Sequence, residues 1–186
     1  MKKVYILLSK TGSLPSRTIH LFTNKKYTHA SISLTASPDG FCSYGRRYLH
    51  NFLIGGLIHE DVRKGIYKIF DNADCELLEI PVNDESYSKL SSLVDMHFDN
   101  YTKCRYKFSA IIPMLLGIKQ ELKFKMTCSQ FVAKLLFESN SCKLPRHPSL
   151  MLPVDFLSIE NISSIYTGKI KDIKLPIIDD KSTDQE

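Results

Sequence analysis

The 186-residue sequence contains no tryptophan and no pair of cysteines separated by two residues. Its five cysteines are odd in number, which argues against a disulfide framework, and the missing C-x-x-C pair argues against a zinc knuckle. The P-loop, the G-x-G-x-x-G fingerprint and the G-x-S-x-G nucleophile elbow do not occur. These absences favour a reducing compartment and exclude the commonest nucleotide-binding and serine-hydrolase signatures.

Long hydrophobic runs are also missing. The apolar stretch near the N-terminus ends at Ser9-Lys10, which is too short for a signal peptide and predicts a buried strand. The run at residues 108–118 contains Pro113 and is too short to span a bilayer, so it is expected to form a buried helix or a lipid-facing surface. We expect a cytoplasmic protein, and the richness in Lys, Ile, Asn and Ser suggests a bacterial source.

The charge pattern gives little sign of a nucleic-acid partner. The formal net charge is +5, and no block of Lys and Arg alternates with aromatic residues. His59-Glu60 begins like a zinc-protease helix but lacks the second histidine at the required spacing. No metal and no other cofactor is expected, because the remaining histidines share no ligand spacing.

Hydrophobic periodicity predicts one α+β domain over residues 1–168, with a charged, loosely ordered tail at 169–186. Strands are expected at residues 4–8, 27–34, 41–48, 57–62, 65–70 and 75–82, and a break at Gly55-Gly56. Helices are expected at 13–22, from Asp84 as N-cap to about 101, at 128–138 and at 155–162. Strands first and helices second describe an antiparallel sheet packed against helices.

The most informative stretch surrounds Cys128. Thr127 followed three residues later by Gln130 is the capping-box pattern, so Cys128 is expected on the first turn of a helix. The unpaired N–H groups and the positive dipole end there favour a thiolate and could stabilise an oxyanion. The apolar face of this helix comprises Phe131, Val132, Leu135 and Leu136.

A base for this nucleophile is available far upstream. His29 opens a predicted strand, and a cysteine paired with a histidine is a recurring nucleophile–base unit. If the sheet packs on the Cys128 helix, two side chains about a hundred residues apart meet across one seam. An inert core cysteine is the alternative, since most helical cysteines are buried packing residues.

This order of elements resembles the circularly permuted branch of the NlpC-type papain-like cysteine hydrolases, which includes lecithin retinol acyltransferase. In that branch the histidine strand precedes the cysteine helix, as it does over residues 4–160 here. The matching motifs are Thr28-His29-Ala30-Ser31-Ile32, Tyr106, Thr127-Cys128-Ser129-Gln130-Phe131-Val132, an early Ser16-Arg17 and a late Pro153-Val154-Asp155. The resemblance implies that Cys128 is a thiol nucleophile, that His29 is the general base and acid, and that Tyr106 lines the substrate pocket.

The third catalytic position departs from this family. Relatives place a His, Glu, Asn or Gln on the strand after the histidine strand, where it orients the imidazole. Here that strand carries no carboxylate, amide or histidine. Sequence distance favours Ser43 as the residue that orients the imidazole. A tight turn would instead place Tyr48 opposite His29 and Arg46 opposite Ser31. Glu60 could also supply a carboxylate from the following segment.

Three functions are compatible with these residues. The first is a thiol hydrolase that cleaves an amide in a peptide, derived for instance from the cell wall, through an acyl-enzyme on Cys128. The second is a lipid-directed thiol acyltransferase or esterase, in which residues 108–118 and the basic residues after them contact a membrane surface. The third is a catalytically silent binding domain of the same fold. The partner is then a peptide or an acyl-bearing small molecule.

Overall fold

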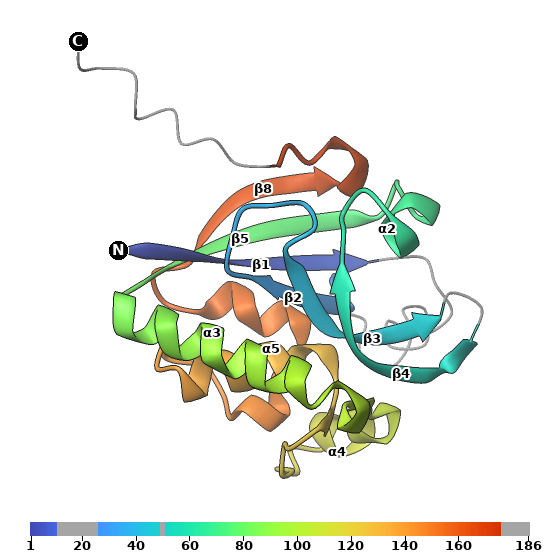
Figure 1. Ribbon diagram of the computed structural model, residues 1–186, viewed down its shortest axis with the longest axis vertical. Coiled ribbons are helices and arrows are strands. Elements are labelled where there is room, and N and C mark those ends of the chain that lie inside the picture. The colour runs from blue at the N-terminus through green and yellow to red at the C-terminus, as the bar shows by residue number, and fades with distance from the viewer. Residues whose placement is uncertain (11–25, 49–50, 176–186) are drawn as a thin grey trace.

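The computed structural model describes residues 1–10, 26–48 and 51–175. A six-stranded antiparallel sheet with the strand order β4-β3-β2-β1-β5-β8 forms its centre (Figure 1). The strands are β1 (Lys2–Lys10), β2 (His29–Ser33), β3 (Phe41–Tyr48), β4 (Asn51–Glu60), β5 (Asp74–Val82) and β8 (Ser163–Lys169). The predicted mixed α+β class with an antiparallel sheet is therefore confirmed. The helix expected at 13–22 and the Ser16-Arg17 motif lie outside the described residues.

Side chains on both faces of the sheet are buried, because alternate residues of a strand point to opposite sides. On one face, Val4 and Ile6 of β1 pack in a cluster with α5 (Cys128–Glu138), which α3 (Asp84–Asp99) joins through Leu90. On the other face, Tyr5 and Leu7 pack with α2 (Gly65–Ile69) and the short helix η5 (Ile170–Asp172). Figure 1 accordingly shows α3 and α5 together on one side of the strands and α2 on the other.

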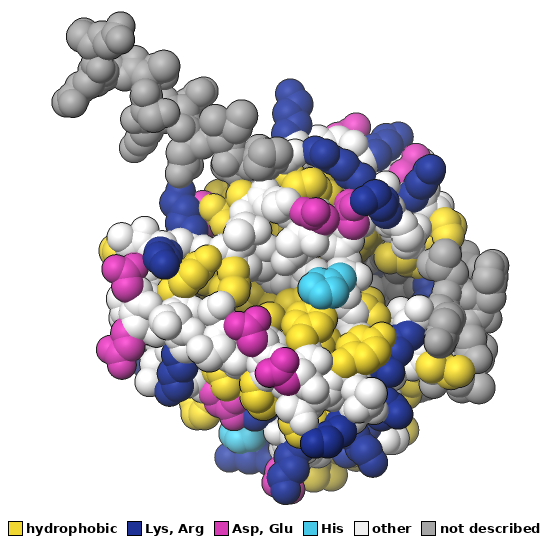
Figure 2. All heavy atoms as spheres, in the orientation of Figure 1, with side chains coloured by type: hydrophobic (Ala, Val, Ile, Leu, Met, Phe, Trp, Pro, Cys, Tyr) yellow, Lys and Arg dark blue, Asp and Glu magenta, His cyan; other side chains and the backbone are white. Residues whose placement is uncertain are grey.

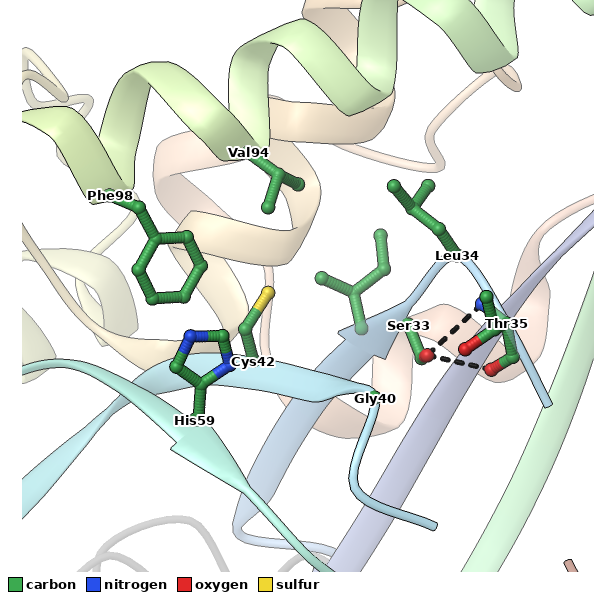
Figure 3. A pocket seen from close by; sticks show the side chains of 9 residues that line it. Ser33, Leu34, Thr35, Gly40, Cys42, His59, Val94 and Phe98 are labelled. Carbon is green, nitrogen blue, oxygen red and sulfur yellow. Dashed lines mark hydrogen bonds between the residues drawn. The ribbon is translucent and has the colours of Figure 1, made fainter. Parts of the chain in front are cut away.

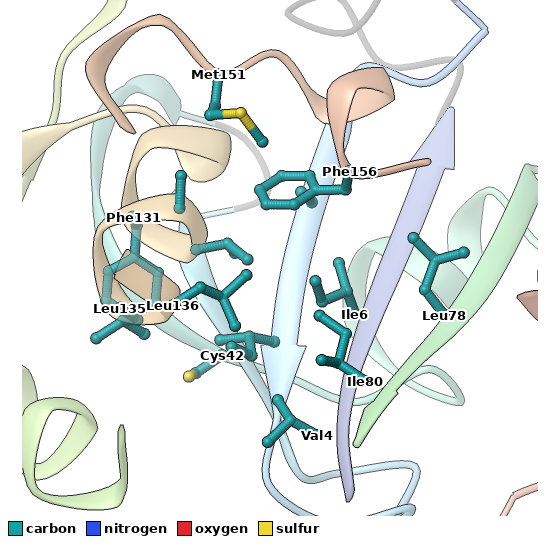
Figure 4. Close-up of a cluster of buried hydrophobic side chains, with 14 of the residues drawn as sticks. Val4, Ile6, Cys42, Leu78, Ile80, Phe131, Leu135, Leu136, Met151 and Phe156 are labelled. Atoms are coloured by element: carbon teal, nitrogen blue, oxygen red, sulfur yellow. The ribbon is translucent and has the colours of Figure 1, made fainter. Parts of the chain in front are cut away.

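Helix α5 is the central element of the first cluster. Phe131, Leu135 and Leu136 are fully buried and point toward Val4, Ile6 and Cys42 of the sheet (Figure 4). The ring of Phe131 lies 4.9 Å from the ring of Tyr44. Burying side chains of this size contributes about 1.5–3 kcal/mol each, so the position of α5 on the sheet is strongly determined. That position also sets where Cys128 lies.

The sequence suggested a break at Gly55-Gly56, but this glycine pair lies within β4. A Cβ at Gly55 would lie 2.7 Å from the Cβ of Tyr106, and one at Gly56 would lie 2.4 Å from the carbonyl oxygen of Cys104. The glycines therefore allow the short strand β6 (Arg105–Tyr106) to pack directly on β4. This close packing of two backbones brings Tyr106 to the sheet.

Other elements correct the sequence-based expectations. Residues 65–70 form helix α2 and not a strand, since a short apolar run does not distinguish the two. The N-cap of α3 is Asn83, whose side chain accepts from the Ser86 N–H, and not Asp84. The expected helix at 155–162 is a 3₁₀ segment, η4 (Pro153–Ser158).

The C-terminal part of the chain is more ordered than expected up to residue 175. Residues 163–169 form the edge strand β8, which the sequence analysis missed, and Ile170, Ile173 and Leu175 are buried in the second cluster. The expected loose tail is wrong for 169–175, because these apolar side chains cover the open face of the sheet. Residues 176–186 lie outside the described part. Within the described part, no helix is long and apolar enough to cross a membrane.

Candidate active site

Cys128 is the first residue of α5, as the capping box predicted. The Thr127 side chain accepts from the Gln130 N–H at 3.4 Å, and the Gln130 side chain accepts from the Thr127 N–H at 3.0 Å. Ser129 and Gln130 then donate to the carbonyl oxygens of Met151 and Ser149, at 2.6 and 2.8 Å. The first turn of α5 is thus held from two directions, and Cys128 is 3 % exposed.

His29 is the first residue of β2 and lies beside the end of β1, where it pairs with Ser9. Its ring lies close enough to Cys128 for each side chain to shift the pKa of the other. The backbone N–H groups of Ala30 and Ser129 also lie near the Cys128 sulfur and help to lower its pKa. The sulfur therefore lies at the seam between the sheet and the N-terminus of α5, where the sequence analysis expected nucleophile and base to meet.

The other side of the imidazole is occupied by a carboxylate. Oε1 of Glu60, at the end of β4, lies 2.7 Å from Nε2 of His29, which leaves Nδ1 as the nitrogen that can exchange a proton with Cys128. Gly45 on the neighbouring strand leaves space for a different side chain, since a Cβ there would lie 2.6 Å from Cδ1 of Ile58. Among the candidates for the orienting residue, the structure brings Glu60 to the imidazole.

Ser43 makes a different contact. Its hydroxyl donates to the carbonyl oxygen of Ala30 at 2.6 Å and so secures β3 to β2. The pairing of Ile32 with Cys42, continued along the antiparallel register, puts Gly45 opposite His29. The tight-turn register that would place Tyr48 there is therefore wrong.

Glu60 is itself held in position by residues that the sequence analysis did not single out. The hydroxyl of Tyr67 in α2 donates to Oε2 of Glu60 at 3.3 Å, and the Ser9 hydroxyl lies 3.2 Å from the same phenol. Glu60 is buried, and Tyr67 is almost fully so. No sequence signal joins these residues, because α2 was predicted as a strand and Ser9 is 58 residues away from Tyr67.

The electrostatics of the site favour a charged pair. Burial disfavours an imidazolium, but the carboxylate of Glu60 and the sulfur of Cys128 outweigh it and hold the pKa of His29 well above its ordinary value. Burial likewise disfavours a thiolate, but the charge and hydrogen bond of His29, with the N–H groups of Ala30 and Ser129, lower the pKa of the Cys128 thiol. Both directions favour the thiolate–imidazolium form over the neutral thiol–imidazole form.

The other cysteines have the opposite environment. Burial raises the pKa of Cys42 and of Cys75 to about 12, and that of Cys142 to about 11. Burial also raises the pKa of Cys104. Cys128 is thus the cysteine of this chain whose surroundings stabilise the thiolate.

Tyr106 completes the surroundings of the sulfur. Its phenol lies near Cys128, and its pKa is well above the ordinary value because of burial and the nearby sulfur charge. The phenol therefore stays protonated and can donate to a thiolate or to an oxyanion formed beside it. The ring of Phe108 lies 4.5 Å from that of Tyr106 and links the site to the segment that follows β6.

A separate cavity of about 140 Å³ lies between the sheet and α3 (Figure 3). Cys42, His59, Val94 and Phe98 line it, and the rings of His59 and Phe98 stack at 4.2 Å. Neither Cys128 nor His29 borders this cavity, so it is not the site of the charged pair. Within the described residues, no cluster of three or more His, Cys, Asp or Glu side chains could hold a metal ion.

No model of a known protein family and no curated protein matches the chain. The functional interpretation therefore depends on the geometry of Cys128, His29, Glu60 and Tyr106.

Proposed function

We propose that the protein is a thiol hydrolase of the permuted NlpC-type papain-like fold that cleaves an amide bond through an acyl-enzyme on Cys128. The observation that carries this proposal is the chain of contacts Cys128–His29–Glu60, in which a buried carboxylate holds the imidazole whose ring meets the sulfur. A nucleophile, a base and an orienting group within hydrogen-bond reach are the requirements for covalent catalysis.

In the acylation step the Cys128 thiolate attacks the carbonyl carbon, and the π electrons move to the carbonyl oxygen. The N-terminus of α5 and the phenol of Tyr106 are the donors available to that oxyanion. When the intermediate collapses, the C–N bond breaks and the imidazolium of His29 gives its proton to the leaving amine. The product is a thioester on Cys128 and a neutral imidazole.

In the deacylation step neutral His29 takes a proton from a water molecule, which attacks the thioester carbonyl. Collapse of the second intermediate releases the acid and regenerates the thiolate beside the imidazolium. Glu60 keeps the imidazole in one orientation and stabilises its positive charge in both steps.

The acyl-enzyme provides the direct test. The protein is mixed with activated esters and with peptide amides, quenched in acid, and examined by mass spectrometry of its peptides. We expect an acyl mass increment on the peptide that contains Cys128, and no increment in Cys128→Ala. Cys142→Ser serves as the matched control and should be acylated like the wild type. Equal labelling of Cys128→Ala would overturn the assignment of the nucleophile.

The lipid-directed acyltransferase or esterase remains the second candidate, and the exposed apolar side chains of residues 112–118 favour it. The same thiol chemistry would then act on an ester, with an acceptor alcohol or amine in place of water. The silent binding domain is less well supported, because a domain without chemistry has no need of the Glu60 carboxylate beside His29.

A further inference from the structure

Apolar side chains gather on one part of the surface next to the candidate site. Ten large hydrophobic residues in the described part are exposed, and four of them lie within seven positions. These are Ile112 (67 % exposed), Leu115 (41 %), Leu116 (69 %) and Ile118 (54 %), from α4 (Ile111–Leu115) and the turn after it. Single exposed apolar residues are ordinary, whereas a group of this kind marks an interaction surface.

The same region carries the excess positive charge of the chain. Residues 100–125 contain five lysines and one arginine but a single acid, Glu121, which leaves +5, equal to the formal net charge of the whole protein. Lys119 and Lys125 are exposed on either side of the acid, which pairs with Lys123 at 3.1 Å. In Figure 2, Lys and Arg side chains gather at the lower end of the molecule, where Figure 1 places α4.

We call the surface formed by the exposed apolar residues of 112–118 and by Lys119 and Lys125 the α4 tip. We propose that the α4 tip binds the interface of a bilayer that contains anionic lipids. Exposed aliphatic side chains followed along the chain by exposed lysines suit a membrane surface, where the apolar groups enter the acyl boundary and the cations meet anionic headgroups. A protein partner fits less well, because lysine is depleted and aromatic residues are enriched in protein–protein interfaces. The five residues of α4 are too few to cross the bilayer, so the tip rests in its outer layer.

The α4 tip connects to the candidate site over a short stretch of chain. The Tyr106 phenol lies near Cys128. Its ring contacts Phe108, the first residue of η2 (Phe108–Ala110), which leads directly into α4. Membrane binding would hold the site near the bilayer surface and favour substrates presented there. The surface itself does not depend on the reactivity of Cys128.

Vesicle sedimentation tests the proposal with the full-length protein. Vesicles of phosphatidylcholine alone are compared with vesicles that also contain phosphatidylglycerol. We expect binding to the anionic vesicles that falls as salt is added. Leu116→Glu and Ile112→Glu should each weaken binding about tenfold or more, and Lys119→Gln with Lys125→Gln about fivefold per lysine.

Matched controls come from other exposed sites. Ile69→Glu changes an isoleucine that is 58 % exposed on α2, and Lys89→Gln changes an exposed lysine on α3; both should bind like the wild type. Cys128→Ser should also bind normally, which separates failure of this surface from failure of the thiol chemistry. Thermal melts check that each variant is folded.

Three results would overturn the proposal. The first is absence of binding to either kind of vesicle. The second is equal loss of binding in Ile69→Glu and Leu116→Glu. The third is a wild-type protein that self-associates without binding vesicles and becomes monomeric in Leu116→Glu, which would assign the α4 tip to a second copy of the chain.

Discussion

Replacing Glu60 by glutamine removes the negative charge next to the imidazole while retaining the size of the side chain and an oxygen acceptor. The contact in question is the 2.7 Å bond between Oε1 of Glu60 and Nε2 of His29. A hydrogen bond between charged groups contributes about 1.5–3 kcal/mol and a neutral one about 0.5–1.5 kcal/mol. The loss of charge attraction in a buried site adds to this difference, so the total is about 1–3 kcal/mol.

This free energy acts on the equilibrium between the thiolate–imidazolium pair and the neutral thiol–imidazole pair. Because 1.36 kcal/mol corresponds to a factor of ten, Glu60→Gln should shift that equilibrium toward the neutral pair by about 5- to 150-fold. Turnover of an activated ester at neutral pH should fall by a similar factor. The pKa of His29 is raised by the carboxylate, so its removal lowers that pKa. The alkaline limb of the pH–rate profile, where His29 loses its proton, should therefore move to lower pH.

Two variants serve as controls in the same assay. Ser43→Ala removes a hydroxyl bonded to the Ala30 carbonyl, and Glu76→Gln changes another buried carboxylate, which accepts from Tyr27 and Ser164 on a different part of the sheet. Both should leave the position of the alkaline limb unchanged. If Glu60→Gln turns over at the wild-type rate with a wild-type pH profile, Glu60 does not act on the imidazole and the reasoning is refuted.

Three further predictions concern the same region. Iodoacetamide at neutral pH should modify Cys128 before the more exposed Cys142, because the pKa of Cys128 is lowered and that of Cys142 is raised to about 11. If the lowered pKa of Cys128 is wrong, peptide mass spectrometry would show the reverse order of modification. Tyr106→Phe should slow that alkylation about tenfold without unfolding the protein, because the phenol beside the sulfur is lost while the ring contact remains. An unchanged rate would contradict the role of the phenol. Gly56→Ala should lower the free energy of unfolding by about 1–3 kcal/mol, since its Cβ would meet a backbone carbonyl at 2.4 Å. The control is Gly168→Ala, whose Cβ would meet only a side chain that can move. Equal losses of stability for both variants in denaturant titrations would argue against the close packing of β6 on β4.

Local sequence patterns determined a large part of this protein. The capping box at Thr127 placed Cys128 on the first turn of its helix, because a cap needs only residues three positions apart. Apolar runs located β1 and β5, and the helical period located α3 and α5, since each element must bury apolar side chains. The order of these elements was sufficient for the α+β class and for the pairing of His29 with Cys128.

Only the tertiary structure decided the rest. Whether Ser43, Tyr48 or Glu60 meets His29 depends on strand register, and a shift of one residue reverses which side chains share a face. The chain has no local feature that reports this register, and the position of Glu60 is visible only when β3 and β4 are side by side. The hydrogen bond from Tyr67 to Glu60 joins α2 to β4, and only the packing of these elements brings the two residues together. The exposure of the α4 tip depends likewise on which side chains the rest of the chain leaves uncovered. The proposed nucleophile and base could therefore be found from short motifs, whereas the contact of Glu60 with His29 and the apolar surface depend on long-range contacts.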